Sequence, residues 1–201
     1  MAMTPEQEKA YVELAQKGDV DAFNMLVEQH QRLAVNLAAR LLGDLGLGED
    51  ATQNAFMSAY RGLSGFRGGN FRSWLLRIVA NACHDIRRSS GRRPTASLDD
   101  EDLGLVAVLR SPQESPEDHA IRMELQREIQ RGISTLAEDQ KLALILVDVQ
   151  GFGYQEVAEV LNANLGTVKS RLSRARSALR DHMLKRRELL PAGLRLDTED
   201  G

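Results

Sequence analysis

Residues 154–180, which read YQEVAEVLNANLGTVKSRLSRARSALR, decide the fold of the carboxy-terminal half of this 201-residue chain. The first part has helical period, and its inward residues are Val157, Ala158 and Leu161. After a turn at Asn162-Ala163-Asn164, a second stretch repeats apolar residues at three- and four-residue spacing, namely Val168, Leu172, Ala175 and Leu179. Two amphipathic helices joined by a tight turn predict a helix-turn-helix, with the small Ala158 at the crossing point.

The outward face of the second helix is polar and basic. A helix that enters the major groove of DNA needs short polar groups and forked donors at its leading end. The residues predicted to read DNA are Thr167, Lys169, Ser170, Arg171, Ser173, Arg174 and Arg176. Arg176 and the basic residues from Arg180 to Arg187 are better placed for phosphates, which add affinity without sequence information. A plain helical hairpin is the alternative interpretation of this pattern.

Charge elsewhere in the chain is unevenly distributed. The net charge of −3 by itself argues against a nucleic-acid-binding protein. Arginines nevertheless gather in residues 61–93, and lysines and arginines gather in residues 169–187. Acidic residues lie between these blocks, at 99–102 and 114–118. This order predicts two polyanion-binding surfaces, whereas a solvated helix face is the alternative for either block alone.

The amino-terminal half shows a weak helical pattern followed by three stronger ones. The helices are expected near residues 6–16, 23–41, 49–63 and 71–86. Gly18-Asp19 offers a break and a cap before the first long helix. Gly43–Gly48 is expected to be a loop, after which Glu49 and Asp50 open the next helix where its dipole favours carboxylates. Gly65–Gly69 breaks the chain again.

The middle of the chain, from Pro94 to Pro116, loses all periodicity and is rich in Pro, Ser and Asp, which predicts a linker. Beyond it, a helix is expected over residues 121–136 and a buried helix over 142–149. Aromatic residues make up only 4% of the chain, which favours helices over a β-sandwich or barrel. The prediction is an all-α fold of two small helical domains joined by a flexible acidic linker. The expected ranges are 1–93, 94–118 for the linker, 119–188, and 189–201 for a tail.

Several classes of function are not supported by the sequence. Cys83 is the single cysteine, so no intramolecular disulfide forms, and no familiar zinc spacing is present. No catalytic triad and no phosphate-binding loop is visible, so we expect no enzymatic activity, metal or cofactor. The amino terminus is polar and no apolar run is long enough to cross a bilayer, which predicts a cytoplasmic protein without membrane insertion.

The helix expected over residues 71–86 has a second, polar face. Arg77, Asn81, His84 and Arg88 follow one another at four-, three- and four-residue spacing, away from the apolar stripe. An amide with basic neighbours can hydrogen-bond a base edge while the arginines hold a single strand. The aromatic residues Phe71 and Trp74 are interpreted as core residues, Cys83 as a buried or semi-buried thiol and His30 as a satisfied histidine at the edge of the core.

Both halves of the chain resemble one family. Residues 136–180 resemble the promoter-binding domain of RNA polymerase sigma factors, most closely at Gly166-Thr167-Val168-Lys169-Ser170-Arg171. Residues 21–44, 49–69 and 70–94 resemble the core-binding and promoter-melting domain of extracytoplasmic-function (ECF) sigma factors, in the sigma-70 superfamily. Asn164-Leu165 departs from the usual Pro-Val, and Asn54 departs from the commoner Glu.

The resemblance implies a transcription initiation factor that binds core RNA polymerase, reads the −35 element as duplex, and melts and holds the −10 element. It implies that Asp50, Gln53, Asn54 and Arg61 dock on a coiled coil of the polymerase. It implies that the −10 element is recognised by Gly62, Phe66, Arg67, Asn70, Arg77, Ile78, Asn81 and Arg88, with one flipped base in a pocket. The family also implies an anti-sigma partner, a linker that threads the polymerase cleft, and a role in stress response.

Two other functions are compatible with parts of the sequence. One is a helix-turn-helix regulator that binds its operator unaided, with the amino-terminal half as a sensor or dimerisation domain. The amino-terminal basic block and the residues around Asn81 argue against it. The other is an RNA-binding or anti-termination protein, for which the sequence offers no aromatic stacking platform.

Overall fold

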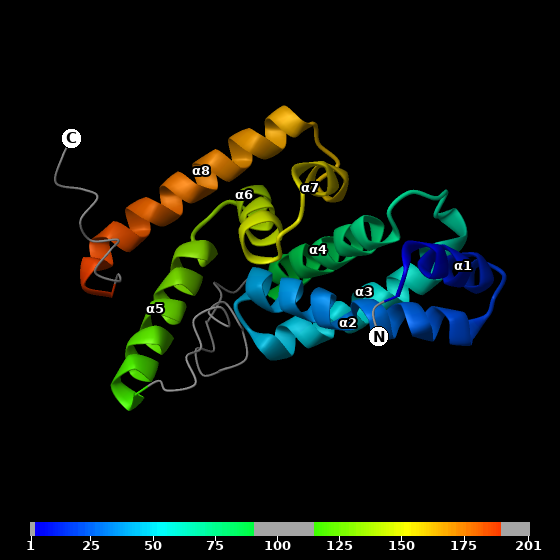
Figure 1. The fold of residues 1–201 in the computed structure, drawn as a ribbon, viewed down its shortest axis with the longest axis horizontal. Helices are drawn as coiled ribbons and strands as arrows, with labels where there is room; N and C mark the ends of the chain where they lie inside the picture. The colour runs from blue at the N-terminus through cyan, green and yellow to red at the C-terminus, as the bar shows by residue number, and fades with distance from the viewer. Residues whose placement is uncertain (1–2, 91–114, 190–201) are drawn as a thin grey trace.

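The computed structural model describes residues 3–90 and 115–189, and within these ranges the chain forms helices and turns without strands (Figure 1). The amino-terminal half contains α1 (Pro5–Gln16), α2 (Val20–Leu42), α3 (Leu45–Gly62) and α4 (Phe71–Ser90). The carboxy-terminal half contains α5 (Pro116–Ser134), α6 (Glu138–Leu144), α7 (Tyr154–Val160) and α8 (Leu165–Met183). The predicted all-α class is confirmed. Most of the predicted linker lies outside the described residues.

Helices α2, α3 and α4 form the amino-terminal bundle, and α1 closes one end of it (Figure 1). The apolar faces meet around fully buried Leu26, Leu37 and Leu75, because the three- and four-residue spacing places these side chains on the inner faces of their helices. The Asp19 carboxylate accepts a hydrogen bond from the Ala22 N–H at 3.0 Å. Asp19 therefore caps α2, as predicted.

The expected loop at Gly43–Gly48 is wrong, because α3 begins at Leu45. Asp44 supplies the cap instead, accepting a hydrogen bond from the Leu47 N–H at 2.8 Å. Gly48 lies inside the helix, where a Cβ atom would come within 2.6 Å of the Ala39 backbone nitrogen. The glycine therefore permits close approach of α3 to α2. Asp50 lies in the second turn of α3 and does not open the helix.

The carboxy-terminal half contains the predicted helix-turn-helix, formed by α7 and α8. Most of the positions predicted to face inward are buried, among them Val157, Val168 and Ala175, each with no exposed surface. Leu161 and Leu179 are half-buried and pack against the same core. Asn164 caps α8 through a hydrogen bond from the Thr167 N–H to its side-chain oxygen at 2.8 Å. The expected buried helix at 142–149 consists of α6 and a π-helical continuation over Ile145–Val149.

The two halves pack on each other, and α6 and α7 lie against α4 in Figure 1. One hydrophobic cluster includes Val79 and Cys83 of α4 together with Leu146 and Val157 of the carboxy-terminal half. The Gln130 side-chain amide of α5 donates a hydrogen bond to the Arg40 carbonyl of α2 at 2.9 Å. The two halves of the described chain thus share one apolar cluster, while the buried residues of α1 belong to a second cluster within the amino-terminal half.

Candidate nucleic-acid interface

The first candidate surface is the outward face of α8. Of the residues predicted to read DNA, the exposed ones are Lys169, Ser170, Ser173, Arg174 and Arg176, and Thr167 and Arg171 are half-buried. Thr167 is partly committed to the cap, since its hydroxyl donates a hydrogen bond to the Asn164 side-chain oxygen at 3.0 Å. The leading turns of α8 therefore present polar and basic groups to solvent.

A groove of about 420 Å³ runs along this face of α8. It is lined by Tyr154, Lys169, Leu172, Ser173, Arg176, Ser177 and Arg180. Lys169, Ser173, Arg176 and Arg180 lie at four-, three- and four-residue spacing, so they share one stripe of the helix. Tyr154 and Ser177 line the groove but were not among the residues predicted from the sequence. The helical spacing was a signal for Ser177, whereas the position of Tyr154 depends on how α7 packs beside α8.

Two arginines of α8 are held by carboxylates of neighbouring elements. Arg171 bonds the Asp139 carboxylate of α6 at 2.6 Å, which directs its guanidinium toward α6. Arg176 makes a two-pronged contact with Asp148, at 2.9 Å from Nε and 2.5 Å from Nη2. Hydrogen bonding to Asp148 raises the pKa of Arg176 above its ordinary value. These contacts fix the side chains before any ligand arrives.

The second candidate surface is the loop between α3 and α4, residues 66–70. Gly68 and Gly69 have φ angles of 90° and 95°, in the region that favours glycine, and they turn the chain sharply. The loop is tied to α1, because the Gln16 side-chain amide donates to the Phe66 carbonyl at 2.7 Å. At its end, the Asn70 side-chain oxygen accepts from the Ser73 N–H at 3.0 Å and caps α4. The loop is thus fixed at both ends.

A cavity of about 350 Å³ lies between this loop and α4. It brings together four residues predicted for the −10 element, namely Phe66, Arg67, Asn70 and Arg77. It is also lined by Ser73 and Trp74, and by Glu159 of α7. We call it the strand groove. It combines amide and guanidinium donors with an aromatic wall, the groups that hold single-stranded nucleic acid.

The other residues predicted for the −10 element lie outside the strand groove. Gly62 is the last residue of α3 and lies beside Trp74. A Cβ atom added to Gly62 would lie 3.9 Å from Cζ2 of the Trp74 indole. Ile78 is half-buried against the apolar core, and Asn81 and Arg88 are exposed on later turns of α4. In this arrangement, Asn81 continues the polar face beyond the cavity.

The aromatic residues near the groove divide into two kinds. Phe71 is 2% exposed and is a core residue, as predicted. Trp74 is half-buried, and its ring lies 5.2 Å from the Phe66 ring and 5.6 Å from the Phe71 ring. Trp74 therefore packs on the core and also lines the groove, which its place in the apolar stripe did not indicate.

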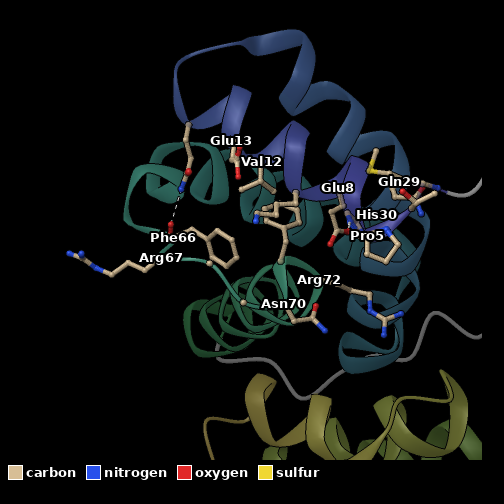
Figure 2. A pocket seen from close by; sticks show the side chains of 17 residues that line it. Pro5, Glu8, Val12, Glu13, Gln29, His30, Phe66, Arg67, Asn70 and Arg72 are labelled. Carbon is tan, nitrogen blue, oxygen red and sulfur yellow. Dashed lines mark hydrogen bonds and ion pairs between the residues drawn. The ribbon is translucent and has the colours of Figure 1, made fainter.

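A larger cavity, of about 800 Å³, lies on the other side of the loop, beneath α1. Figure 2 shows Glu8 and Val12 of α1 on one wall and Phe66 of the loop on another, while Arg67 extends outward. His30 is 4% exposed, and its Nε2 lies 2.7 Å from the Glu8 carboxylate. The prediction of a satisfied histidine at the core edge is confirmed.

Phe152 and Glu156 contact the start of α4, next to the strand groove. Arg72, at the start of α4, forms an ion pair with Glu156 and lies over the Phe152 ring at 4.2 Å from its centroid. Burial alone would raise the pKa of Glu156. Hydrogen bonds from the Gly153 N–H, Arg72 and Asn70 outweigh this effect, so the pKa of Glu156 is lowered. Arg72 and Glu156 were missed because neither residue carries a sequence signal for contact with the other half.

The third candidate surface is one face of α3. Asp50, Gln53, Asn54 and Arg61 are all exposed, as docking residues must be. Large apolar side chains accompany them, with Leu47 42%, Met57 47% and Tyr60 42% exposed. Leu47, Asp50, Asn54, Met57 and Arg61 follow three- and four-residue spacing along one stripe, the pattern with which a helix packs along another helix. The apolar members were missed, although the spacing was available.

Other chemistry is limited in the described part of the chain. Within residues 3–90 and 115–189, no cluster of three histidine, cysteine or acidic side chains forms a metal site. No helix in those ranges is long and apolar enough to span a membrane. Cys83 is 2% exposed, which confirms the predicted buried thiol, and burial raises the pKa of that thiol to about 12.

Comparison with known proteins identifies the family. Residues 26–93 match the sigma-70 region 2 family and residues 126–179 match the sigma-70 region 4 family. The chain is 36% identical to the RNA polymerase sigma-H factor of Pseudomonas aeruginosa over 181 residues, covering 88% of this chain and 94% of that protein. It is 36% identical to the ECF RNA polymerase sigma-E factor of Escherichia coli K12 over 179 residues, covering 86% and 92%.

Two solved structures resemble the fold. One is CnrH in complex with the cytosolic domain of CnrY, with a TM-score of 0.63 and 26% identity over 87% of this chain and 96% of that one. The other is the sigma factor RpoE in complex with the anti-sigma factor NepR from Bartonella quintana, with a TM-score of 0.58 and 25% identity over 80% and 96%. The chain therefore belongs to the sigma-70 family, as an ECF sigma factor that directs RNA polymerase to promoters.

Proposed function

We propose that this sigma factor divides promoter recognition between its two halves. The α3 face binds core RNA polymerase, the strand groove and α4 hold the melted −10 element, and α8 reads the −35 element in duplex DNA. The observation that carries the proposal is the presence of two basic surfaces of different kinds in one chain. An exposed recognition helix suits duplex DNA, and an aromatic-lined groove suits a single strand.

The assignment of the −35 element to α8 is supported by its stripe of exposed basic residues. Lys169 reaches solvent near the leading end of α8, where a recognition helix meets base edges, and Arg174 reaches solvent at the middle of the helix. Arg180 lies further along and suits a phosphate. The carboxylate of Asp148 holds Arg176, which lines the groove along α8, and this limits the conformational entropy lost when DNA binds.

The assignment of the −10 element to the strand groove is supported by its chemistry. Arg67 and Arg77 supply positive charge for the backbone of a strand, and Trp74 and Phe66 supply ring surface for a base. The exposed amide of Asn81, one turn beyond Arg77, can hydrogen-bond a base edge. Capture of an unstacked base offsets the few kcal/mol lost when its pair opens.

The assignment of polymerase docking to α3 is supported by the exposed stripe from Leu47 to Arg61. Leu47 and Met57 offer apolar contact area, and Asp50, Asn54 and Arg61 between and beyond them offer polar contacts that fix register. A helix of a coiled coil in the polymerase is the partner that this spacing fits.

The proposal extends to regulation, organisation and place of action. Both structural neighbours were solved with a second chain bound, the cytosolic domain of CnrY in one and the anti-sigma factor NepR in the other. We therefore propose that an anti-sigma factor binds this protein as well. Residues 1–93 and 119–188 are the proposed domains, 94–118 the linker and 189–201 the tail. The protein acts in the cytoplasm with RNA polymerase, and it contributes binding without catalytic activity of its own.

Runoff transcription tests this function. Core polymerase from the source organism is incubated with pooled genomic promoter fragments, with and without the purified protein, and the transcripts are mapped. We expect specific start sites only when the protein and core are both present. Tight, specific duplex binding by the free protein without core-dependent initiation would instead show an operator-binding regulator. Binding to RNA without initiation would show an anti-termination protein.

A further inference from the structure

The strand groove is lined by both halves of the chain. Its floor is the 66–70 loop with the start of α4, and Glu159 of α7 completes its lining beside Asn70 and Arg77. Glu156, one turn before Glu159, forms the ion pair with Arg72. One carboxylate of α7, that of Glu159, therefore lines the strand groove together with Arg67 and Arg77. The other, that of Glu156, pairs with Arg72, which precedes the groove residue Ser73 in α4.

We propose that α7 is an intramolecular competitor of the promoter strand, with Glu159 taking the place of a phosphate at the strand groove and Glu156 that of a phosphate at the neighbouring Arg72. This inference rests on the proposed function of that groove. A carboxylate and a phosphate bind an arginine in the same way, through charge-assisted hydrogen bonds to a planar guanidinium. The two ligands of the groove are therefore mutually exclusive.

Further contacts beyond the groove hold α7 in place. Arg87 of α4 forms an ion pair with Glu138 of α6, and the Gln130 amide is bonded to the Arg40 carbonyl. Apolar residues of both halves belong to one cluster, which includes Leu76 and Val79 of α4 and Ala143 and Leu146 of the carboxy-terminal half. The carboxylates thus act at the edge of a larger apolar contact, so α7 stays at the groove until the halves separate.

The packed arrangement also prevents the two DNA surfaces from engaging one promoter. If the −35 and −10 elements are centred about 25 base pairs apart, they lie roughly 85 Å apart along duplex DNA, at about 3.4 Å per base pair. Here α7, the helix that supports α8, contacts α4 directly. Strand binding and separation of the halves are therefore thermodynamically linked, and each favours the other.

The inference is tested with the full chain carrying Glu156→Gln and Glu159→Gln together. Glutamine keeps the capping contact that the Glu156 side chain makes with the Gly153 N–H, so α7 retains its start while two charges are removed. The matched control is Glu6→Gln with Glu28→Gln, because both residues are exposed and neither lines the groove. The control reproduces the change in net charge without touching α7.

The probe is a fluorescein-labelled single-stranded DNA of twelve nucleotides with randomised sequence, measured by anisotropy at low ionic strength. We expect the Glu156→Gln/Glu159→Gln variant to bind about three- to tenfold more tightly than the control, since the partly exposed Arg72–Glu156 ion pair contributes up to about 1 kcal/mol and the groove lining loses the charge of Glu159. Equal affinity of variant and control would overturn the inference. So would the absence of binding by either protein.

A distance measurement provides the second test. Spin labels at Asn24→Cys in α2 and Asp181→Cys in α8, both exposed positions, are introduced together with Cys83→Ala. We expect the label separation to increase when the DNA binds, and to be longer in the glutamine variant before DNA is added. Bound DNA with an unchanged separation would show that α7 and the strand coexist. Neither measurement involves transcription. The inference can therefore fail while the proposed function stands, and the proposed function can fail in the runoff assay whatever these two measurements show.

Discussion

Arg72 of α4 and Glu156 of α7 form an ion pair that joins the two halves of the chain. The two side chains are 39% and 30% exposed, so the pair contributes at most about 1 kcal/mol. The shared apolar cluster supplies most of the stability of the contact, while the ion pair fixes how α7 lies against the start of α4, next to the strand groove. A weak polar contact at the edge of an apolar one is well suited to being replaced by a ligand.

The close approach of α3 to α2 gives a prediction about stability. Gly48→Ala places a Cβ atom within 2.6 Å of the Ala39 backbone, so the helices must move apart at a cost of about 1–3 kcal/mol. Gly46→Ala in the same helix is the control, since its nearest contact is the Asp44 side chain at 3.4 Å, and it should gain up to about 1 kcal/mol of helix propensity. Urea unfolding measures both changes. Equal effects of the two substitutions would contradict the packing that we describe.

Lys141 gives a prediction about pH. Its side chain is fully buried, and burial lowers its pKa to about 8 from 10.5, with Glu138 opposing the shift. Between these two values the unfolded chain binds the proton that the folded chain lacks, so Lys141 makes stability rise with pH across this window. Below pH 8 the buried ammonium is charged and stability is lowest.

Lys141→Met removes this contribution, and the difference between variant and wild type cancels the titration of other groups. We expect the variant to gain stability relative to wild type at pH 7, and we expect that gain to shrink by about 1–3 kcal/mol by pH 10. Urea unfolding at a series of pH values supplies the measurement. A difference that stays constant from pH 7 to 10 would show that Lys141 does not titrate in this range.

The exposed stripe of α3 gives a prediction about polymerase binding. Met57→Ala should weaken binding to core RNA polymerase about tenfold, the loss expected for an apolar anchor at an interface centre. Met25→Ala is the matched control, because Met25 is also exposed, at 39%, but lies on α2. Titration of a fluorescent label on the protein with core polymerase gives both affinities. If the two substitutions weaken binding equally, α3 is not the docking surface.

The middle of α8 and its carboxy-terminal part should differ in how they bind DNA. Arg180→Ala should weaken binding to all duplexes alike and reduce the dependence of binding on salt by about one phosphate contact. Arg174→Ala should cost about 1–3 kcal/mol on a −35 duplex and leave binding to unrelated duplexes nearly unchanged. Anisotropy titrations over a range of salt concentrations separate these effects. Loss of specificity in the Arg180 variant would reverse the two roles.

The helices that position the candidate sites could be predicted from sequence because apolar spacing and caps are local signals. Asp19 and the alternation of inward residues in α7 and α8 are examples. Gly48 misled the prediction because a glycine that permits close helix packing looks the same in sequence as one that ends a helix. Whether Gly48 belongs to a helix depends on Ala39, which only the tertiary structure brings near.

The same distinction applies to the sites. The polar stripes of α3, α4 and α8 follow from helical spacing, so most of their members were predicted. The strand groove depends on tertiary contacts, and Trp74, Ser73 and Glu159 entered it only when the helices were placed. The pairing of Arg72 with Glu156 joins residues 84 positions apart in the chain, and each carries an ordinary surface charge. No pattern within either half indicates such a partner.

The most direct test of the proposed division of promoter recognition between α4 and α8 is the reactivity of −10 thymines to permanganate. It is measured in complexes that core polymerase forms with the Asn81→Ala variant and in complexes that it forms with the unaltered protein. Binding of each complex to a duplex that contains only the −35 element is measured in parallel. We predict that Asn81→Ala reduces thymine reactivity severalfold and leaves −35 binding unchanged, because Asn81 lies on α4, away from α8. Equal losses in both measurements would contradict the assignment of strand holding to α4 and of duplex reading to α8.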